Sequence, residues 1–255
     1  MLLVGSALNG YAIAATDGRI GTVRDLLFDD RTWKVRWAVV DTGTWLAGRK
    51  VLVHPSAVDR ADHEHKELAV QLTRQQVENS PSILEDEPVS MQMESHLHEY
   101  YGWDPLWGGS YFGAGAINAP VSASQYFGSR VLREETEPSV LPTEGDQHLC
   151  SAAALSRCHI HATDGTIGHV ENVLIDDADW CIHYLIVDTK NWWPGKRVLV
   201  SPYAVRSLNW LDRTVELDVT REKVRTSPAW DPLVIIDQYY QKRLHRHYGW
   251  PGYGW

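Results

Sequence analysis

The first 75 residues alternate between short apolar segments and polar turns, at a spacing typical of β-strands. Two β-branched and aromatic segments, at 20–28 and 33–40, flank the polar residues 29–32, which predict a hairpin loop. Ahead of them, Thr16-Asp17-Gly18 predicts a tight turn, because aspartate bonds to its own backbone and glycine accepts positive φ. Three further short strands are expected at 51–53, 57–58 and 68–72.

Helical signals follow the strands. Thr73 stands where a helix N-cap is expected, and Gln76 three residues later completes a capping box. A helix of about two turns is therefore predicted before the Ser-Pro pair at 80–81. Longer helices are predicted over about 89–101 and 233–248. The apolar positions of the second recur at spacings of three and four: Leu233, Ile236, Tyr240 and Leu244.

The whole pattern occurs twice. Residues 15–21 return as residues 162–168, an offset of 147, and at that offset residues 14–60 and 161–207 are identical at 22 of 47 positions without a gap. The offset continues into a Leu-His-x-x-Tyr-Gly-Trp motif, which ends at Trp103 in the first copy and at Trp250 in the second. This identity is far above what shared composition gives by chance, and it indicates an internal duplication.

The duplication predicts two modules joined by a linker. The first module is expected at residues 1–104 and the second at 149–255, each with a C-terminal helix. Residues 105–148 are rich in Gly, Ser, Ala and Pro and contain an acidic run at 134–137, which is linker composition. A loop of this length inside one compact domain would be unusual, so its composition and length both favour the two-module organisation.

Each copy contains the same ordered set of motifs, over about residues 8–82 and 155–229. A Thr-Asp-Gly turn leads to an Ile-Gly-x-Val strand, an Asp-Asp hairpin, a Val-Asp-Thr strand end and a Val-Leu-Val-x-Pro strand. This set resembles the PRC-barrel family, which includes the cytoplasmic domain of the photosynthetic reaction centre H subunit and the C-terminal barrel of the ribosome maturation factor RimM. The resemblance implies a mainly β fold with short helices: two small PRC-like β-barrels in tandem, each followed by a C-terminal helical segment. It also implies protein binding and carries over no catalytic residue.

Composition narrows the class of partner and the compartment. The formal net charge is −9 and the 24 lysines and arginines form no basic block, so we expect no direct nucleic-acid binding. Three cysteines without a CxxC spacing predict neither a disulfide framework nor a zinc knuckle, which fits a reducing cytoplasm. The short apolar opening lacks a basic flank, so no transmembrane segment is expected. A peripheral position at a membrane complex would depend on a partner.

Twelve histidines are the strongest argument for chemistry, since His-x-His pairs begin at residues 63, 96, 159 and 245. Residues i and i+2 share a face on a strand but diverge by about 200° on a helix. Only His159 and His161 are expected on a strand, and their counterparts are Ala12 and Ala14. No metal or cofactor is therefore predicted, although metal binding by this pair stays open. No nucleophile and base recur in both copies, so we expect no enzyme.

Aromatic residues in loops and in the repeated tail are the candidates for contact. The Tyr-Gly-Trp tail either packs within its own or its sister copy, or forms an interface with another protein, where Trp and Tyr most often carry binding energy. An aromatic loop before two basic residues is the second candidate. The candidate interaction residues are Trp45, Tyr101, Trp103, Trp192, Trp193, Tyr248 and Trp250.

Together these features favour a non-catalytic adaptor of bacterial or archaeal type, whose two modules pack as an internal pseudo-dimer with pseudo-twofold symmetry. Formation of a homo-oligomer stays open. One alternative is a regulatory subunit of a membrane electron-transfer complex similar to the reaction centre. Another is a ribosome-associated factor similar to RimM, and a third, metal-binding or enzymatic, rests on His159 and His161 alone.

Overall fold

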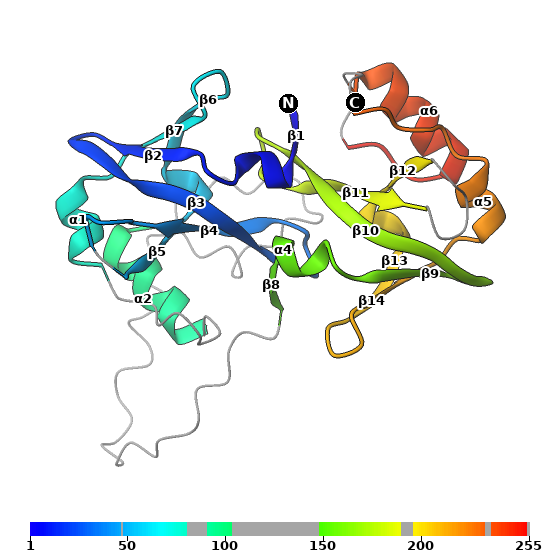
Figure 1. Ribbon diagram of the computed structural model, residues 1–255, viewed down its shortest axis with the longest axis horizontal. Coiled ribbons are helices and arrows are strands. Elements are labelled where there is room, and N and C mark those ends of the chain that lie inside the picture. The colour runs from blue at the N-terminus through cyan, green and yellow to red at the C-terminus, as the bar shows by residue number, and fades with distance from the viewer. Residues whose placement is uncertain (47, 81–90, 104–147, 190–195, 233–235, 254–255) are drawn as a thin grey trace, which may run out of the picture.

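The computed structural model describes residues 1–46, 48–80, 91–103, 148–189, 196–232 and 236–253 (Figure 1). The predicted linker lies outside the described residues, with the exception of His148. Trp192, Trp193 and Leu233 also lie outside them. Within the described ranges, none of the helices combines the length and the apolar character needed to cross a lipid bilayer.

In its described residues the first module has six strands and two α-helices of its own: β2 (Ala12–Ala15), β3 (Gly18–Asp29), β4 (Val35–Asp41), β5 (Lys50–Val53), β6 (Val58–Asp62), β7 (Glu67–Val70), α1 (Arg74–Glu78) and α2 (Met91–Tyr101). The second repeats them: β9 (His159–Ala162), β10 (Gly165–Asp176), β11 (Ile182–Asp188), β12 (Arg197–Val200), β13 (Val205–Asn209), β14 (Thr214–Leu217), α5 (Arg221–Arg225) and α6 (Gln238–Tyr248). A short strand precedes each module, β1 (Leu2–Val4) and β8 (Leu149–Ser151), followed by a single turn of helix, η1 (Gly5–Leu8) and α4 (Ala152–Leu155). Two further short turns are η2 (Pro55–Ala57) and η4 (Pro202–Ala204).

Each module is one strongly bent sheet. The strand orders are β5-β4-β3-β2-β7-β6 and β12-β11-β10-β9-β14-β13. Of the strand pairs in the described residues, only β2–β7 and β9–β14 are parallel. Register shifts interrupt the long strands β3 and β10, which bends them so that they pair with different neighbours along their length. The mainly β fold with short helices is confirmed. Among the described residues the ladder of each sheet is open, because its end strands do not pair with each other.

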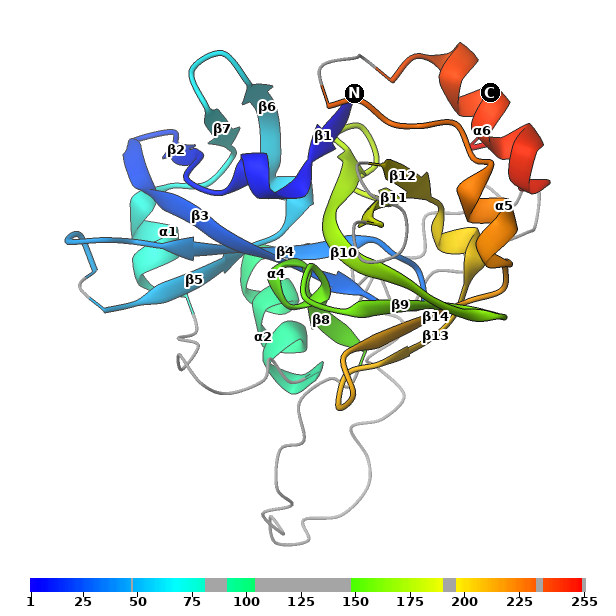
Figure 2. The same cartoon turned by 45° about the vertical axis from the view of Figure 1, so that its right-hand side comes forward.

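The seventh strand of each sheet belongs to the segment that precedes the other module. Strand β1 pairs antiparallel with β10, with Leu3 opposite Ile175, and β8 pairs with β3, with Cys150 opposite Phe28 (Figure 2). Leu3 and Cys150 are equivalent at the offset of 147, so the exchange is reciprocal. The chain therefore interlocks its two copies, which the sequence analysis did not predict.

Side chains hold the exchanged segments at equivalent positions. Asp25 Oδ1 accepts a hydrogen bond from the backbone N–H of Ala153, and Asn172 Oδ1 accepts one from Ser6, both at 3.2 Å. Each acceptor satisfies the start of a helical turn that belongs to the other copy, where backbone N–H groups have no partner within the turn. The exchange is thus fixed by side-chain contacts as well as by the strand ladder.

The hairpin loops of β3–β4 and β10–β11 meet at the centre of the molecule. The backbone N–H of Val35 donates to the carbonyl of Trp180, and that of Ile182 donates to the carbonyl of Trp33, both at 2.8 Å. Both tryptophans have positive φ, 60° and 55°, a conformation uncommon for a bulky residue. This backbone turns each carbonyl towards the sister copy, and it also explains why β4 begins at Val35 and not at the predicted position 33.

A third reciprocal contact comes from the loops between β6 and β7 and between β13 and β14. His63 Nε2 lies 3.2 Å from a carboxylate oxygen of Asp177, and Trp210 Nε1 donates to Asp30 at 3.5 Å. His63 and Trp210 are equivalent positions, as are Asp30 and Asp177. The Asp-Asp pairs predicted as hairpin loops therefore also receive the loops of the sister copy.

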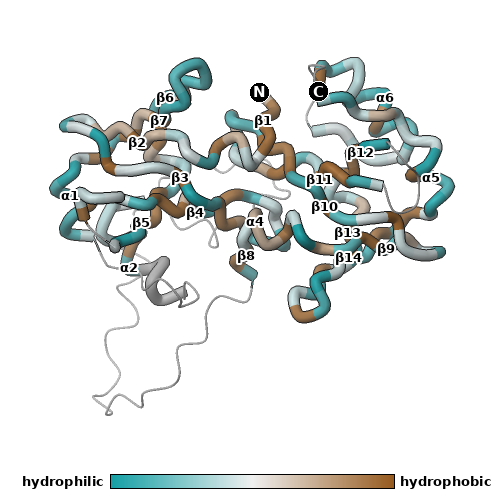
Figure 3. Tube along the Cα trace, in the orientation of Figure 1, coloured by the Kyte–Doolittle hydropathy of each residue, from teal (hydrophilic) through white to brown (hydrophobic). Residues whose placement is uncertain are grey.

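One continuous apolar core runs through both modules. It includes Leu8 and Phe28 from the first copy and Leu155 and Ile175 from the second, each at most 1% exposed. In Figure 3 the hydrophobic segments concentrate in the strands, whereas peripheral loops such as the β6–β7 loop are hydrophilic. Because apolar burial is the main stabilising term in folding, the two copies share much of their stability.

The predicted start of α1 is confirmed in atomic detail. Thr73 Oγ1 accepts from the backbone N–H of Gln76 at 3.2 Å, and Gln76 Oε1 accepts from that of Thr73 at 2.8 Å, which is a full capping box. Asp17, in the predicted Thr-Asp-Gly turn, accepts from the N–H of Arg74 at 2.7 Å, and Asp164 bonds to Arg221 in the same way. This turn motif therefore connects a strand turn to the helix that follows the barrel strands.

The longer helices α2 and α6 cover the outer face of their own sheets. Leu97 of α2 packs with Trp37 and Leu52, and Leu244 of α6 packs with Tyr184 and Leu199. The predicted helices, 89–101 and 233–248, end at the same residues as α2 and α6. Helix α6 begins later than predicted because Asp237 is its N-cap and accepts from the N–H of Tyr240 at 2.7 Å.

Candidate interaction surfaces

The Tyr-Gly-Trp motif is the C-terminal cap of each long helix. Gly249 adopts φ 83°, in the left-handed region, and lets the chain fold back so that the N–H of Trp250 donates to the carbonyl of His245 at 3.0 Å. The rings of Tyr248 and Trp250 then stack with their centroids 4.0 Å apart, and those of Tyr101 and Trp103 stack at 4.2 Å. The spacing of the motif is therefore required by the cap.

Both ring pairs pack on their own module and remain partly exposed. Trp103 lies against Trp37, with centroids 5.9 Å apart, and against His54 at 5.5 Å. Trp250 lies against the buried His245 at 5.8 Å. The structure thus places these candidates in the packing of the outer sheet face, with part of each residue still exposed.

The histidine of the repeated tail is buried in both copies, but its surroundings differ. His245 Nε2 is 2.8 Å from the hydroxyl of Tyr184, and burial lowers the pKa of His245. His98 instead lies beside a second imidazole, His54, with ring centroids 5.3 Å apart. Burial first, and then the charges of His98 and Arg36, lower the pKa of His54 from 6.5 to about 3. His54 is therefore neutral in the folded protein at neutral pH.

The His54 imidazole predicts a loss of stability in acid. In the unfolded chain His54 gains its proton near pH 6.5, whereas in the folded protein it does so only near pH 3. Proton uptake by the unfolded state therefore lowers the free energy of unfolding as pH falls through this window, by up to roughly 1.4 kcal/mol per pH unit.

A His54→Ser variant should lose this part of the pH dependence. Serine is the residue of the second copy, and Ser201 accepts from the N–H of Tyr203 just as His54 accepts from that of Ser56, so the cap of the short helical turn is kept. Urea unfolding between pH 7 and pH 4 measures the slope. An unchanged slope in the variant would show that His54 does not titrate in this way.

Trp45 lies in the loop after β4 and is half-buried. The guanidinium of Arg74 is 4.5 Å from the centroid of its ring, a cation–π contact that joins this loop to α1. Its counterpart Trp192 and the neighbouring Trp193 lie outside the described residues, so the aromatic loop can be placed only in the first module.

His159 and His161 occupy strand β9 as expected. His161 Nδ1 is 3.1 Å from a carboxylate oxygen of Glu216 on the adjacent β14, while His159 is exposed. Among the residues that the structure describes, no group of three or more His, Cys, Asp or Glu side chains has a geometry suited to a metal ion. The His161 imidazole therefore has a partner within its own sheet, the carboxylate of Glu216.

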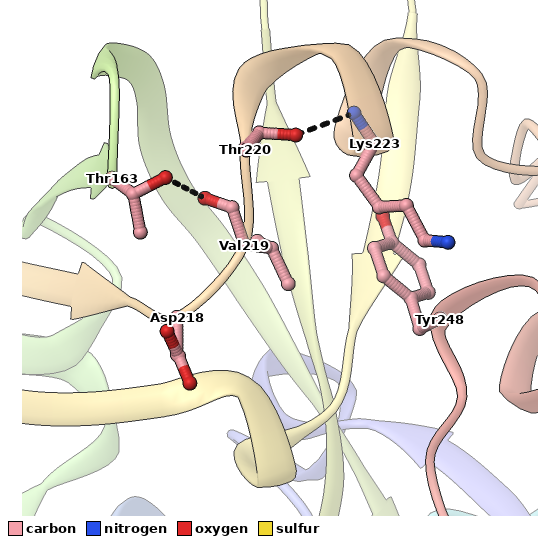
Figure 4. A pocket seen from close by; sticks show the side chains of 6 residues that line it. All are labelled: Thr163, Asp218, Val219, Thr220, Lys223 and Tyr248. Carbon is pink, nitrogen blue, oxygen red and sulfur yellow. Dashed lines mark hydrogen bonds between the residues drawn. The ribbon is translucent and has the colours of Figure 1, made fainter.

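A surface pocket of about 300 Å³ lies between β14, α5 and the end of α6 (Figure 4), lined by Thr163, Asp218, Val219, Thr220, Lys223 and Tyr248. Thr163 Oγ1 donates to the carbonyl of Val219, and Thr220 Oγ1 accepts from the N–H of Lys223, both at 3.3 Å. Burial raises the pKa of Tyr248 to about 12, so its phenol keeps its proton at neutral pH. The pocket is a polar notch with an ammonium and a carboxylate at its rim.

An aromatic group at the C-terminal end of the chain was missed by the sequence analysis. The ring of Tyr253 stacks on His183, with centroids 4.0 Å apart, and on Tyr203 at 5.4 Å. Its hydroxyl is 2.6 Å from Ser201 Oγ and donates to the carbonyl of His183 at 2.7 Å. The only signal was the aromatic and glycine content of residues 251–255, which lie beyond the repeated motif.

Comparison with known proteins identifies the scaffold. The model of the PRC-barrel domain family matches residues 5–75 and 160–224, together more than half of the chain. The chain belongs to the PRC-barrel domain family. The resemblance seen in the sequence is thus confirmed, in two tandem copies. A search of curated proteins gives no match. The exchanged strands β1 and β8 and the helices α2 and α6 lie outside the matched PRC-barrel regions.

Proposed function

We propose that this chain is a non-catalytic adaptor protein whose two PRC-barrel modules form one scaffold for protein binding. The observation that supports this function is the contrast between what the copies share and what they do not. Shared positions such as Asp17 and Asp164, or His98 and His245, make capping and packing contacts inside the scaffold. Positions on the solvent-facing helices have diverged, as expected when each copy serves a different contact.

The arrangement of the helices also supports an adaptor. Helices α2 and α6 lie on different sides of the molecule, one on each module (Figures 1 and 2). The three reciprocal contacts and the common core fix these faces relative to each other. A rigid scaffold pays little conformational entropy on binding, which favours simultaneous engagement of two surfaces.

Affinity capture tests the adaptor function. The tagged full-length chain is incubated with extracts of its own host, with soluble and membrane fractions kept apart, and bound proteins are quantified by mass spectrometry. We expect one protein partner in near-stoichiometric amount, and we expect an excess of untagged chain to reduce its capture. Capture restricted to a membrane electron-transfer complex or to ribosomes would favour the alternatives named above, and no stoichiometric partner in either fraction would contradict the adaptor function.

A further inference from the structure

The solvent-facing side of α6 carries a cationic stripe. Tyr239, Lys242, Arg243 and Arg246 are all exposed and follow one another at spacings of three, one and three, so they lie on one side of the helix. Tyr239 is 73% exposed. None of the 11 residues of α6 is acidic, although the chain as a whole has a formal net charge of −9. We call these four residues the α6 cationic face.

The scaffold does not require this stripe. The equivalent positions in the first copy are Gln92, Ser95, His96 and Glu99. His96 and Glu99 are exposed on α2, which packs on its sheet in the same way as α6. The packing common to both helices therefore does not require Arg243 and Arg246.

Two carboxylates of the second module near α6 make contacts of their own. Asp237 accepts the N–H of Tyr240 as the helix cap, and Glu222 on α5 is paired with Arg225 at 2.6 Å. The cationic surface extends towards α5 instead, because His247 Nε2 lies 2.8 Å from the carbonyl of Lys223, whose own side chain is exposed. The local surface is thus positive over parts of two helices.

The opposite side of α6 holds the helix in place. Leu244 is fully buried, and the hydroxyl of Tyr240 donates to the carbonyls of Pro228 and Ala229 at 3.4 and 3.3 Å. The guanidinium of Arg243 lies 5.5 Å from the centroid of the Tyr240 ring. The cations are therefore displayed on a pre-formed helix, which lowers the entropy cost of binding.

We propose that the α6 cationic face binds an acidic segment of a partner protein, whose carboxylates meet Arg243 and Arg246 while an apolar side chain packs on Tyr239. This inference rests on the proposed adaptor function and names the class of its partner. An acidic segment of a protein fits better than a membrane or a nucleic acid. Those polyanions present a wide negative surface that the remaining charge of the chain, −9 overall, repels, whereas a short segment meets only the local patch within about 10 Å.

The first test uses a defined probe, a fluorescently labelled 15-residue peptide rich in glutamate with interspersed leucines, titrated with the full chain. We expect salt-sensitive binding that weakens at least about tenfold in the Arg243→Glu/Arg246→Glu variant. The matched control is Arg19→Glu/Arg60→Glu, which reverses two exposed arginines of the first module and changes the net charge equally. The control should bind within about twofold of the parent chain, and circular dichroism verifies that both variants fold.

Several outcomes would overturn the inference. These are absence of peptide binding, an equal loss in both variants, or binding of anionic lipid vesicles or duplex DNA through this face when the peptide fails. The second test repeats the affinity capture with both variants. If the protein partner is retained by Arg243→Glu/Arg246→Glu, the adaptor function stands and the α6 cationic face is not its site. If the parent chain captures nothing, the adaptor function itself fails.

Discussion

Replacing Leu3 by proline is expected to destabilise the second module, although Leu3 precedes the first. Asp177 donates its N–H to the carbonyl of Met1, so the antiparallel alternation places Leu3 and Ile175 as the next hydrogen-bonded pair. Proline has no N–H and leaves a carbonyl of β10 unpaired, which costs about 2 kcal/mol or more. The neighbouring Leu2 and Val4 also pack on the apolar cluster under α6, and their contacts would be lost with the strand.

Hydrogen exchange measured by mass spectrometry locates this effect. Peptides covering β10 should lose protection in Leu3→Pro, while peptides covering β3 keep it. The matched control is Cys150→Pro, the equivalent change in β8, which should expose β3 and leave β10 protected. Loss of protection confined to the module that follows the mutated strand in sequence would show that the strands are not exchanged.

Alanine at Gly21 is expected to cost more stability than alanine at any solvent-facing glycine. A Cβ at Gly21 would collide with the backbone carbonyl of Asp41, and one at Gly168 would collide with that of Asp188. The obstacle is backbone in the middle of a sheet, so neither side can move away cheaply. We expect a loss of roughly 3 kcal/mol or more in the free energy of unfolding for each substitution.

Gly10 provides the control for this prediction. It has φ 85°, but an added Cβ would meet no atom within 4 Å, so Gly10→Ala measures the conformational penalty alone, about 1–2 kcal/mol. Urea unfolding of the three variants gives the comparison. A loss in Gly21→Ala no larger than that in Gly10→Ala would mean that β3 and β4 can separate, and would contradict the close packing described here.

Local patterns in the sequence predicted most of the local structure. The β-branched segments, the turn at Asp17 and the capping box at Thr73 depend on neighbours within a few residues, and their physical signals are contained in those neighbours. The left-handed conformation of Trp33 was not predictable in this way, because it is stabilised by a hydrogen bond from Ile182 on the sister copy. The pattern of β-branched and aromatic residues alone predicts a strand that already includes Trp33.

The strand exchange was not predictable from local pattern for the same reason. The three residues of β1 directly precede the first module, and nothing in their sequence distinguishes pairing with β3 of the same copy from pairing with β10 of the sister copy. Only the pairing of Leu3 with Ile175 decides this, and it arises because the two copies face each other.

The candidate interaction residues show a similar limit. The Tyr-Gly-Trp motif was recognisable by its repetition, but its role in capping α2 and α6 depends on the left-handed Gly102 and Gly249 and on the stacking that follows. The α6 cationic face could not be predicted from the repeat, because Arg243 and Arg246 are at positions where the two copies differ. Surface specialisation of one copy becomes visible only when the helix faces are known.

Cleavage between the modules tests the central claim, that the two copies form one interlocked unit. A site for a specific protease is inserted within residues 105–147, the purified chain is cut to completion, and its mass is measured under native conditions by size exclusion with light scattering. We predict that the two halves remain together as a 1:1 complex with the mass of the intact chain, because β1, β8 and the common core hold them without the covalent connection. Separation into two folded monomers at micromolar concentration would contradict the account.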